Sequence, residues 1–323
     1  MIAATTYETL LEAARSLVDS QMLATSHTAS DSATRAYVAA NGAQLEAARA
    51  ALAAGCRVPL RFDESFFGDH CADWQPLRNL AQTFALEFQV AAADGDIAAA
   101  GQIGVNMLDL ANAIRRDGLV IDLLVAVAVD QIAINLLRQI RAHLEAADRE
   151  TLIRDLDRIE RDQEPAADIF ARDQQWEAVV GYQNEKLKDS PQSPPDSSEG
   201  GLTKEQRHKD ALRIMQISQD QHVVALRRML VIDLALRCWH ATNGAYPDDL
   251  GTLAFTFLSR VPDDPFTQKP FCYRRFADSF LLFSPGPTGI IHGGVFGPWP
   301  KVQAGVADLC LDSFDCGSEA KGS

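Results

Sequence analysis

Positive charge is scarce in this sequence. The 323 residues include 30 Lys and Arg against 44 Asp and Glu, which gives a formal net charge of -14. An acidic surface repels the phosphate backbone of nucleic acids and anionic lipid headgroups. The composition therefore argues against a nucleic-acid partner. The same composition is 47% hydrophobic, which is enough for a large buried core.

The short motifs that identify common enzymes are missing as well. The sequence has no Gly-x-Ser-x-Gly turn, no His-Glu-x-x-His motif, no P-loop and no Gly-x-Gly-x-x-Gly motif. These absences count only against the widespread catalytic classes. We accordingly predict no catalytic residue, no cofactor-binding residue and no metal ligand.

No long apolar run is free of polar residues. The most apolar segment, Leu119–Leu137, contains Asp122 and Asp130, a pattern typical of a helix buried in a protein core. Residues 1–11 have neither the basic part nor the apolar part of a signal peptide. These segments predict either a cytoplasmic protein or one whose export segment has been removed.

Cysteine is infrequent and shows no metal-binding spacing. Six cysteines permit 15 disulfide connectivities, and no Cys-x-x-Cys pair occurs. Cys310 and Cys316 flank an acidic turn and could close a small loop. We expect buried thiols or disulfide partners instead of metal ligands. The connectivity stays open among Cys56, Cys71, Cys238, Cys272, Cys310 and Cys316.

Helical periodicity dominates the first part of the chain, residues 1–188. Apolar residues recur there at helical spacing, and turns such as Asp94-Gly95-Asp96 separate the segments. Short turns between long helices make neighbours antiparallel, so we predict a mainly α fold built as an array of helical hairpins. The expected helices are Tyr7–Ser20, Ala33–Ala54, Trp74–Ala93, Asp96–Arg116, Leu119–Leu144, Asp148–Asp162 and Pro165–Lys188.

One hairpin of this array loosely resembles a tetratricopeptide repeat. Small residues at its turn, including Gly95 and Ala100, let two helices approach closely. The resemblance covers a single copy, whereas stacked repeats need about three units. We therefore interpret the segment as close helix packing within the array.

A low-complexity segment, residues 189–201, follows the array. It is rich in Ser, Pro and Gly, which predicts a flexible linker. The last part, residues 202–323, opens with a long helix from Thr203 to Thr242 that is apolar nearly all round between Val223 and Trp239. We expect this helix to fold back onto the array, so that both parts share one core.

The end of the chain predicts a small α+β unit. Gly244 ends the long helix, and residues 247–258 indicate a short one. Two aromatic-rich runs, 271–276 and 279–284, are separated by two residues and fit a β-hairpin. The chain after Gly286 is rich in Gly and Pro and is expected to be irregular.

Two motifs of this unit occur in a known family. A long helix ends in a Gly-x-Tyr-Pro turn at Gly244–Pro247, and the loop Val261–Pro265 precedes the hairpin. In this order the segment resembles the C-terminal region of the major pseudopilin of type II secretion, which implies a shared fold element. Fibre assembly and calcium binding are not implied, because Lys204–Lys209 lies upstream and Pro285–Gly289 stands where the acidic ligands are expected.

A wider set of motifs follows in order along the chain. Cys56–Leu60 reads Cys-Arg-Val-Pro-Leu, Leu77–Ala81 reads Leu-x-x-Leu-Ala, and Gly118–Asp122 starts an apolar helix. With the Tyr-Pro and hairpin tail, this order resembles a large family of planctomycetal proteins, usually tethered by an N-terminal membrane segment. The resemblance implies export, paired cysteines and an N-terminal anchor absent from this chain, and it implies no activity.

Two groups of polar residues are candidates for chemistry. Carboxylates near a histidine can do acid–base work where a pocket shifts their pKa values, although loops also simply carry solvated charge. Cys238 and His240 are two apart on a helix and point away from each other, which is poor zinc geometry. Packing under the sheet is favoured for Trp299 over an exposed contact. The carboxylate group occupies the predicted loop before Trp74 and comprises Asp63, Glu64, Asp69, His70 and Asp73.

These observations predict a noncatalytic interaction or scaffold domain that acts outside the cytoplasm. Its expected partner is a protein, and any membrane contact is made only through the absent N-terminal anchor. A first alternative is a hydrolase that uses the acidic loop around His70, which requires a deep pocket joining His70 to Asp63 or Asp69. A second alternative is a filament or lattice component that assembles through the pseudopilin-like tail.

Overall fold

The computed structural model is mainly α-helical, with one small antiparallel sheet near the C-terminus. It describes residues 6–23, 30–187 and 204–312, so the predicted linker 189–201 and Cys316 lie outside the described residues. The helices are α1 (Thr6–Arg15), α2 (Asp31–Ala40), α3 (Gly42–Ala53), α4 (Glu64–Ala93), α5 (Ile97–Arg115), α6 (Val120–Ile140), α7 (Ala146–Asp162), α8 (Ala166–Leu187), α9 (Lys204–Asn243) and α10 (Trp299–Gln303). The strands are β1 (Cys272–Arg275), β2 (Phe280–Ser284) and β3 (Leu309–Cys310).

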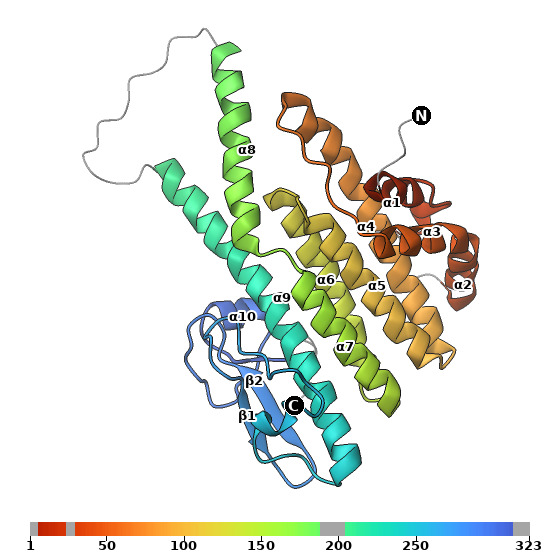
Figure 1. Cartoon of the computed structure of the whole chain (residues 1–323), viewed down its shortest axis with the longest axis vertical. Helices are drawn as coiled ribbons and strands as arrows, with labels where there is room; N and C mark the ends of the chain where they lie inside the picture. Colours follow the sequence, from red (N-terminus) through yellow and green to blue (C-terminus); the bar gives the residue numbers. More distant parts are fainter. Residues whose placement is uncertain (1–5, 24–29, 188–203, 313–323) are drawn as a thin grey trace.

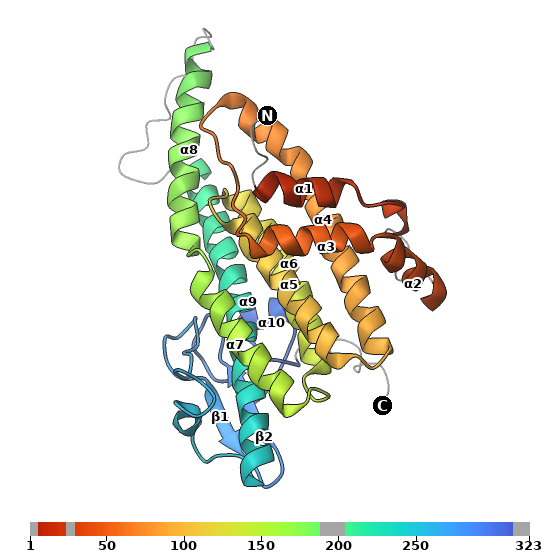
Figure 2. The ribbon, with the colours of Figure 1, turned by 45° about the vertical axis from the view of Figure 1, so that its right-hand side comes forward.

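The long helices lie side by side, as their short connections predict (Figure 1). Helices α4 to α7 follow one another through tight turns, and α5 packs against α4, α6 and α7. In both views the short helices α1 to α3 and the small sheet lie on opposite sides of this array (Figure 2). The predicted fold class, mainly α with a small antiparallel sheet, is confirmed.

Residues 33–54, predicted as one helix, form two helices that meet at Asn41. The Asn41 side chain is fully buried, and its oxygen accepts a hydrogen bond of 2.9 Å from the Val18 N–H. Its side-chain nitrogen donates to the carbonyls of Val18 and Tyr37. Asparagine side chains compete with helical hydrogen bonds in this way. The break follows from a contact with a distant segment, which helical periodicity does not reveal.

Helix α4 begins at Glu64, ten residues before its predicted start at Trp74. Asp63 caps the helix, because its Oδ1 accepts a hydrogen bond of 2.9 Å from the Phe66 N–H. Aspartate is among the strongest N-cap residues. Pro76 favours the first turn of a helix and therefore points to a later start, but it is accommodated inside α4.

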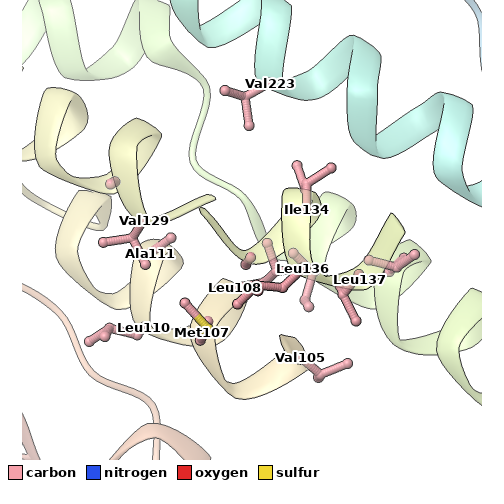
Figure 3. Close-up of a cluster of buried hydrophobic side chains, with 14 of the residues drawn as sticks. Val105, Met107, Leu108, Leu110, Ala111, Val129, Ile134, Leu136, Leu137 and Val223 are labelled. Carbon is pink, nitrogen blue, oxygen red and sulfur yellow. The ribbon is translucent and has the colours of Figure 1, made fainter. Parts of the chain in front are cut away.

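Helix α6 is the central helix of the core. It packs against α4, α5 and α9, and it is the helix with the length and composition of a membrane span among the described residues. Val223 of α9 points toward Ile134 of α6, and Leu108 of α5 lies on the other side of α6 (Figure 3). The buried position predicted for this segment is confirmed.

Helix α9 joins the two parts of the chain. Most of its side chains between Val223 and Cys238 are buried against α6 and α7. Most of the buried apolar residues form one continuous cluster that runs from Tyr7 in α1 to Leu311 after β3. The long helix therefore folds back onto the array as expected, and both parts share one core.

The small sheet contains the predicted hairpin and one strand more. Cys272 of β1 lies opposite Phe283 of β2, and β3 pairs with the same C-terminal end of β2 from its other side. The segment after Gly286 is therefore not irregular throughout, since it contains α10 and β3. Residues 247–258, predicted as a helix, contain only a 3-10 turn at Leu250–Leu253.

Two buried carboxylates hold the loops of this unit. Asp264 accepts hydrogen bonds from the Phe266 N–H at 3.0 Å and from the Ser284 hydroxyl of β2 at 2.8 Å. Asp308 accepts from the N–H groups of His292 and Gly294, each at 3.0 Å. Burying a carboxylate is tolerated when hydrogen bonds satisfy it. These bonds fix a Gly- and Pro-rich tail that lacks regular periodicity.

Two glycines of α5 offer a matched test of the close α5–α6 packing. A Cβ on Gly104 would lie 2.5 Å from Cδ2 and 2.7 Å from Cγ of Leu137, whereas a Cβ on Gly101 would lie 3.7 Å from Leu144. We expect Gly104→Ala to lower the free energy of unfolding by about 1–3 kcal/mol through overpacking. We expect Gly101→Ala to raise it by about 0.5–1 kcal/mol through helix propensity. Urea denaturation measures both, and equal shifts of the same sign would contradict the close approach.

Candidate functional site

The carboxylate group around His70 lies at the start of α4 and not in a loop, contrary to the sequence-based expectation. His70 is 3% exposed, whereas Asp63 and Asp69 reach solvent and both pair with Arg61. His70 contacts Asp73 and Asp122 instead. The structure therefore separates the histidine from the two carboxylates that the hydrolase alternative requires.

His70 links the first turns of α4 to the start of α6. Its Nε2 lies 2.7 Å from Asp122 Oδ1, and its Nδ1 lies 3.2 Å from Asp73 Oδ2. The ring of Phe66 stacks on the imidazole with a centroid distance of 4.9 Å. We call His70, Asp73 and Asp122 the His70 latch. Asp73 also pairs with Arg15 of α1, so the latch joins three helices.

The electrostatics of the His70 latch favour a structural role. Burial by itself lowers the pKa of His70, but its hydrogen bonds to Asp122 and Asp73 outweigh burial and raise the pKa to about 9. The imidazole is therefore protonated at neutral pH, and both ring nitrogens donate to carboxylates. A general base needs a free nitrogen within reach of substrate. The geometry does not support acid–base catalysis at His70.

The described cysteines give little support to a disulfide framework. Cys56, Cys71, Cys238 and Cys272 are free thiols. Cys272 and Cys310 lie opposite the same residue, Phe283, on the two sides of β2. Two strand spacings are about 10 Å, which exceeds the Cα separation of a disulfide. The Cys310–Cys316 pair considered from the sequence involves Cys316, which lies outside the described residues.

The other predicted polar residues serve packing. Cys238 is buried, while His240 packs beside Tyr246 at a centroid distance of 4.5 Å, so the two point apart as expected. Trp299 stacks on His222 at 4.0 Å with nearly parallel rings, which confirms its packing role. Burial lowers the pKa of His222 to about 3. Within the described ranges, no group of three or more His, Cys, Asp or Glu is placed to hold a metal ion.

A cleft of about 730 Å³ opens between α7, α9 and the loop 257–262. Its volume falls within the range of small-ligand and peptide sites. No sequence motif marks this cleft, because its walls come from segments that are far apart in the chain. We call it the α7–α9 cleft. Its apolar lining comprises Ile153, Val224, Val231, Phe257, Leu258 and Pro262.

Charged side chains line the rest of the α7–α9 cleft. Two of its arginines, Arg154 and Arg260, have no carboxylate within ion-pair distance among the described residues, and Arg154 donates instead to the Thr151 hydroxyl at 3.0 Å. Every carboxylate of the lining is already paired. The pairs are Asp157 with Arg161, Glu160 with Arg228, Asp220 with Arg115, and Glu164 with Arg172.

Buried charges lie directly behind the floor of this cleft. Asp130 is 1% exposed, and burial raises its pKa to about 6 although Arg227 and Arg115 lower it. Arg227 is fully buried and donates to Gln163 Oε1. Four nitrogen atoms here have no hydrogen-bond partner among the described residues, namely Nε of Arg115, Nε and Nη1 of Arg227, and Nε2 of Gln163. The cluster is therefore rich in spare donors, while the two Asp130 oxygens are its unpartnered acceptors.

Phe255 stands on the loop that continues into the cleft wall. Phe255 is 94% exposed. Its backbone φ is 63°, in the left-handed region that a bulky residue rarely adopts. A hydrogen bond of 2.7 Å from the Phe255 N–H to the Leu258 carbonyl closes the turn. Such backbone strain persists where the surrounding structure enforces it, often at functional sites.

The His70 latch predicts a defined pH dependence of stability. The folded-state pKa of about 9 exceeds the ordinary value of 6.5, so the stabilisation is full below pH 6.5 and is lost as pH rises through 9. We expect the free energy of unfolding to fall by on the order of 2–3 kcal/mol across this window. Denaturation of His70→Gln should lack this component, whereas substitution of the exposed His143 by Gln should retain it. An unchanged slope in His70→Gln would show that the latch does not carry it.

Comparison with known proteins identifies no relative of this chain. No protein-family model matches the chain, no curated protein matches it, and no solved structure does. The resemblances drawn from sequence motifs therefore stay predictions.

Proposed function

We propose that this protein is a noncatalytic interaction scaffold that binds a protein partner at the α7–α9 cleft. The observation that carries the proposal is the position of Phe255, an exposed aromatic in strained backbone, on the same loop as the cleft wall. Aromatic side chains dominate binding energy at protein interfaces, where they fill pockets and exclude water. A partner that covers Phe255 would also reach the apolar lining of the cleft.

The helical array supplies the rigid support for this site. One cleft wall is α7 and another is α9, and both pack on the core built around α5 and α6. Sites on helices keep their geometry better than sites on loops. Only the 254–262 segment adds a loop, and its turn is closed by the Phe255–Leu258 hydrogen bond. The scaffold therefore presents a largely preformed surface, which reduces the entropy cost of binding.

The location and the family likenesses belong to the same proposal. The proposed extracytoplasmic location rests on the order of the planctomycetal motifs. The free thiols among the described residues give this location no support. The pseudopilin-like character of the tail is supported by Asp264 of the Pro-Asp-Asp-Pro loop, which bonds Ser284 of the hairpin. A tight turn such as the one after Ala93 is common to helical hairpins, so the α4–α5 pair is proposed only as a loosely tetratricopeptide-like hairpin with close helix packing.

A second candidate function is self-assembly through the C-terminal unit. Four large apolar side chains of this unit are 58–60% exposed, more than most apolar residues of the array. Exposed apolar groups that gather on one unit mark interaction surfaces. A second copy of the chain is one partner that could cover them. They are Ile290, Ile291, Val295 and Val306.

A photo-cross-linking residue at position 255 tests the proposed contact. We expect p-benzoylphenylalanine in place of Phe255 to give discrete adducts with another protein in the producing cells. The same residue in place of Ile214, which is 68% exposed on α9, is the matched control and should give none. Phe255→Gly should abolish capture of that protein and leave stability unchanged or raise it by about 1 kcal/mol, because glycine relieves the left-handed φ.

The adducts also separate the candidate functions. An adduct formed by two copies of this chain, together with concentration-dependent sedimentation, would favour self-assembly. Identical adduct patterns at positions 255 and 214 would contradict a specific contact at Phe255. Loss of stability in Phe255→Gly would show that the Phe255 ring packs against the folded chain and is not free to contact a partner.

A further inference from the structure

We infer that the α7–α9 cleft takes an acidic peptide segment, in which a carboxylate stands beside apolar side chains. This inference rests on the proposed function and names the chemistry of the partner. It follows from the charge balance of the cleft, from the spare donors at its floor and from its apolar lining. Each of these observations restricts the occupant in a different way.

The charge balance selects an anion. Each carboxylate of the lining already has an arginine partner, so the charges left over are the guanidinium groups of Arg154 and Arg260. Both residues are exposed on the cleft surface. Arginine binds carboxylates through two parallel hydrogen bonds, which adds geometric specificity. A carboxylate entering between α7 and the 257–262 loop would pair with guanidinium groups that have no carboxylate within ion-pair distance among the described residues.

The polar floor selects an acceptor. Arg115 and Gln163 line the cleft, and their Nε and Nε2 atoms lack hydrogen-bond partners among the described residues. Arg115 is 1% exposed, so its unpartnered donor is buried beside the cleft. A buried donor without a partner costs free energy. Both atoms are buried, so they act on an occupant of the cleft through their partial positive charge, which favours a peptide carbonyl or a carboxylate at the floor.

The apolar lining selects a peptide over a small inorganic anion. Val224 and Val231 are seven residues apart and line the cleft from one face of α9, while Leu258 and Pro262 face it from the loop. A volume of about 730 Å³ exceeds the need of a single oxyanion. Apolar side chains of the ligand would cover these surfaces and contribute by their burial. Extended nucleic acid fits poorly, because its many phosphates meet a chain of net charge -14.

Selection of peptides on the full chain tests the inference. A random seven-residue phage library is selected on the wild-type protein, and the enriched sequences are synthesised with a fluorescent label. We expect Asp or Glu next to Leu, Ile or Phe. Glutamine in place of the acidic residue should weaken binding at least tenfold, an effect typical of a lost charged pair. A labelled DNA duplex is measured in parallel and should not bind.

Charge-reversed variants locate the site. The double variant R154E/R260E should lose binding of the acidic peptides at least tenfold and shift selection toward Lys-containing sequences. The control R78E reverses an exposed arginine of α4 that does not line the cleft and should keep wild-type affinity. Both residues of the double variant are exposed, so circular dichroism should show an unchanged fold. A conservative R154K/R260K variant should retain part of the affinity.

The outcomes separate this inference from the proposed function. Enrichment of basic or neutral sequences, equal binding by R154E/R260E, tighter binding of DNA, or no enrichment would each overturn the acidic-peptide inference. The proposed function survives these results if position 255 still cross-links to a partner protein. If position 255 gives no cross-link to a partner protein either, the proposed interaction scaffold is contradicted as well.

Discussion

The burial of α9 against α6 and α7 is the constraint on which the rest of the structure depends. From Val223 to Cys238 this helix is apolar on nearly every side, so it needs protein on more than one face. Helices α6 and α7 cover part of its surface, and the small sheet packs on it as well. The same placement sets Asp220 and Val224 opposite α7 and thereby creates the α7–α9 cleft. The packing of α9 therefore determines the core, the position of the small sheet and the α7–α9 cleft.

Buried charges fix how the helices sit within that packing. Close packing already limits how the helices can shift, and a buried charge that loses its ion-pair partner is strongly destabilising. His70 ties α4 to Asp122 at the start of α6, and Arg115 of α5 pairs with Asp220 of α9. Asp130 of α6 lies near Arg115 and Arg227. These contacts disfavour shifted arrangements of α5, α6 and α9, which would separate the charges.

The sequence predicts what is local and misses what is tertiary. Helical periodicity located α5 to α9 closely, and the aromatic-rich runs located β1 and β2, because both signals repeat within one element. The break at Asn41 depends on a hydrogen bond to Val18, and the cleft depends on segments that meet only after folding. The residue types of the Asp63–Asp73 segment single out His70, but they do not reveal its partner Asp122, which lies 52 positions away. A carboxylate inside an apolar helical run is the sequence signal that could identify Asp122.

Net charge and local charge act on different steps of binding. The charge of -14 repels an acidic segment at long range, so it slows the encounter and is screened within about 10 Å at moderate salt. In the proposed complex, Arg154 and Arg260 would act only after contact, by pairing with the carboxylate of the bound segment and slowing its release. Added salt would therefore raise the association rate and, by weakening the arginine pairs, the dissociation rate as well. Because salt changes both rates, a partner whose affinity comes mainly from several apolar contacts beside one carboxylate is favoured. The free energy of apolar contacts does not depend on ion pairing.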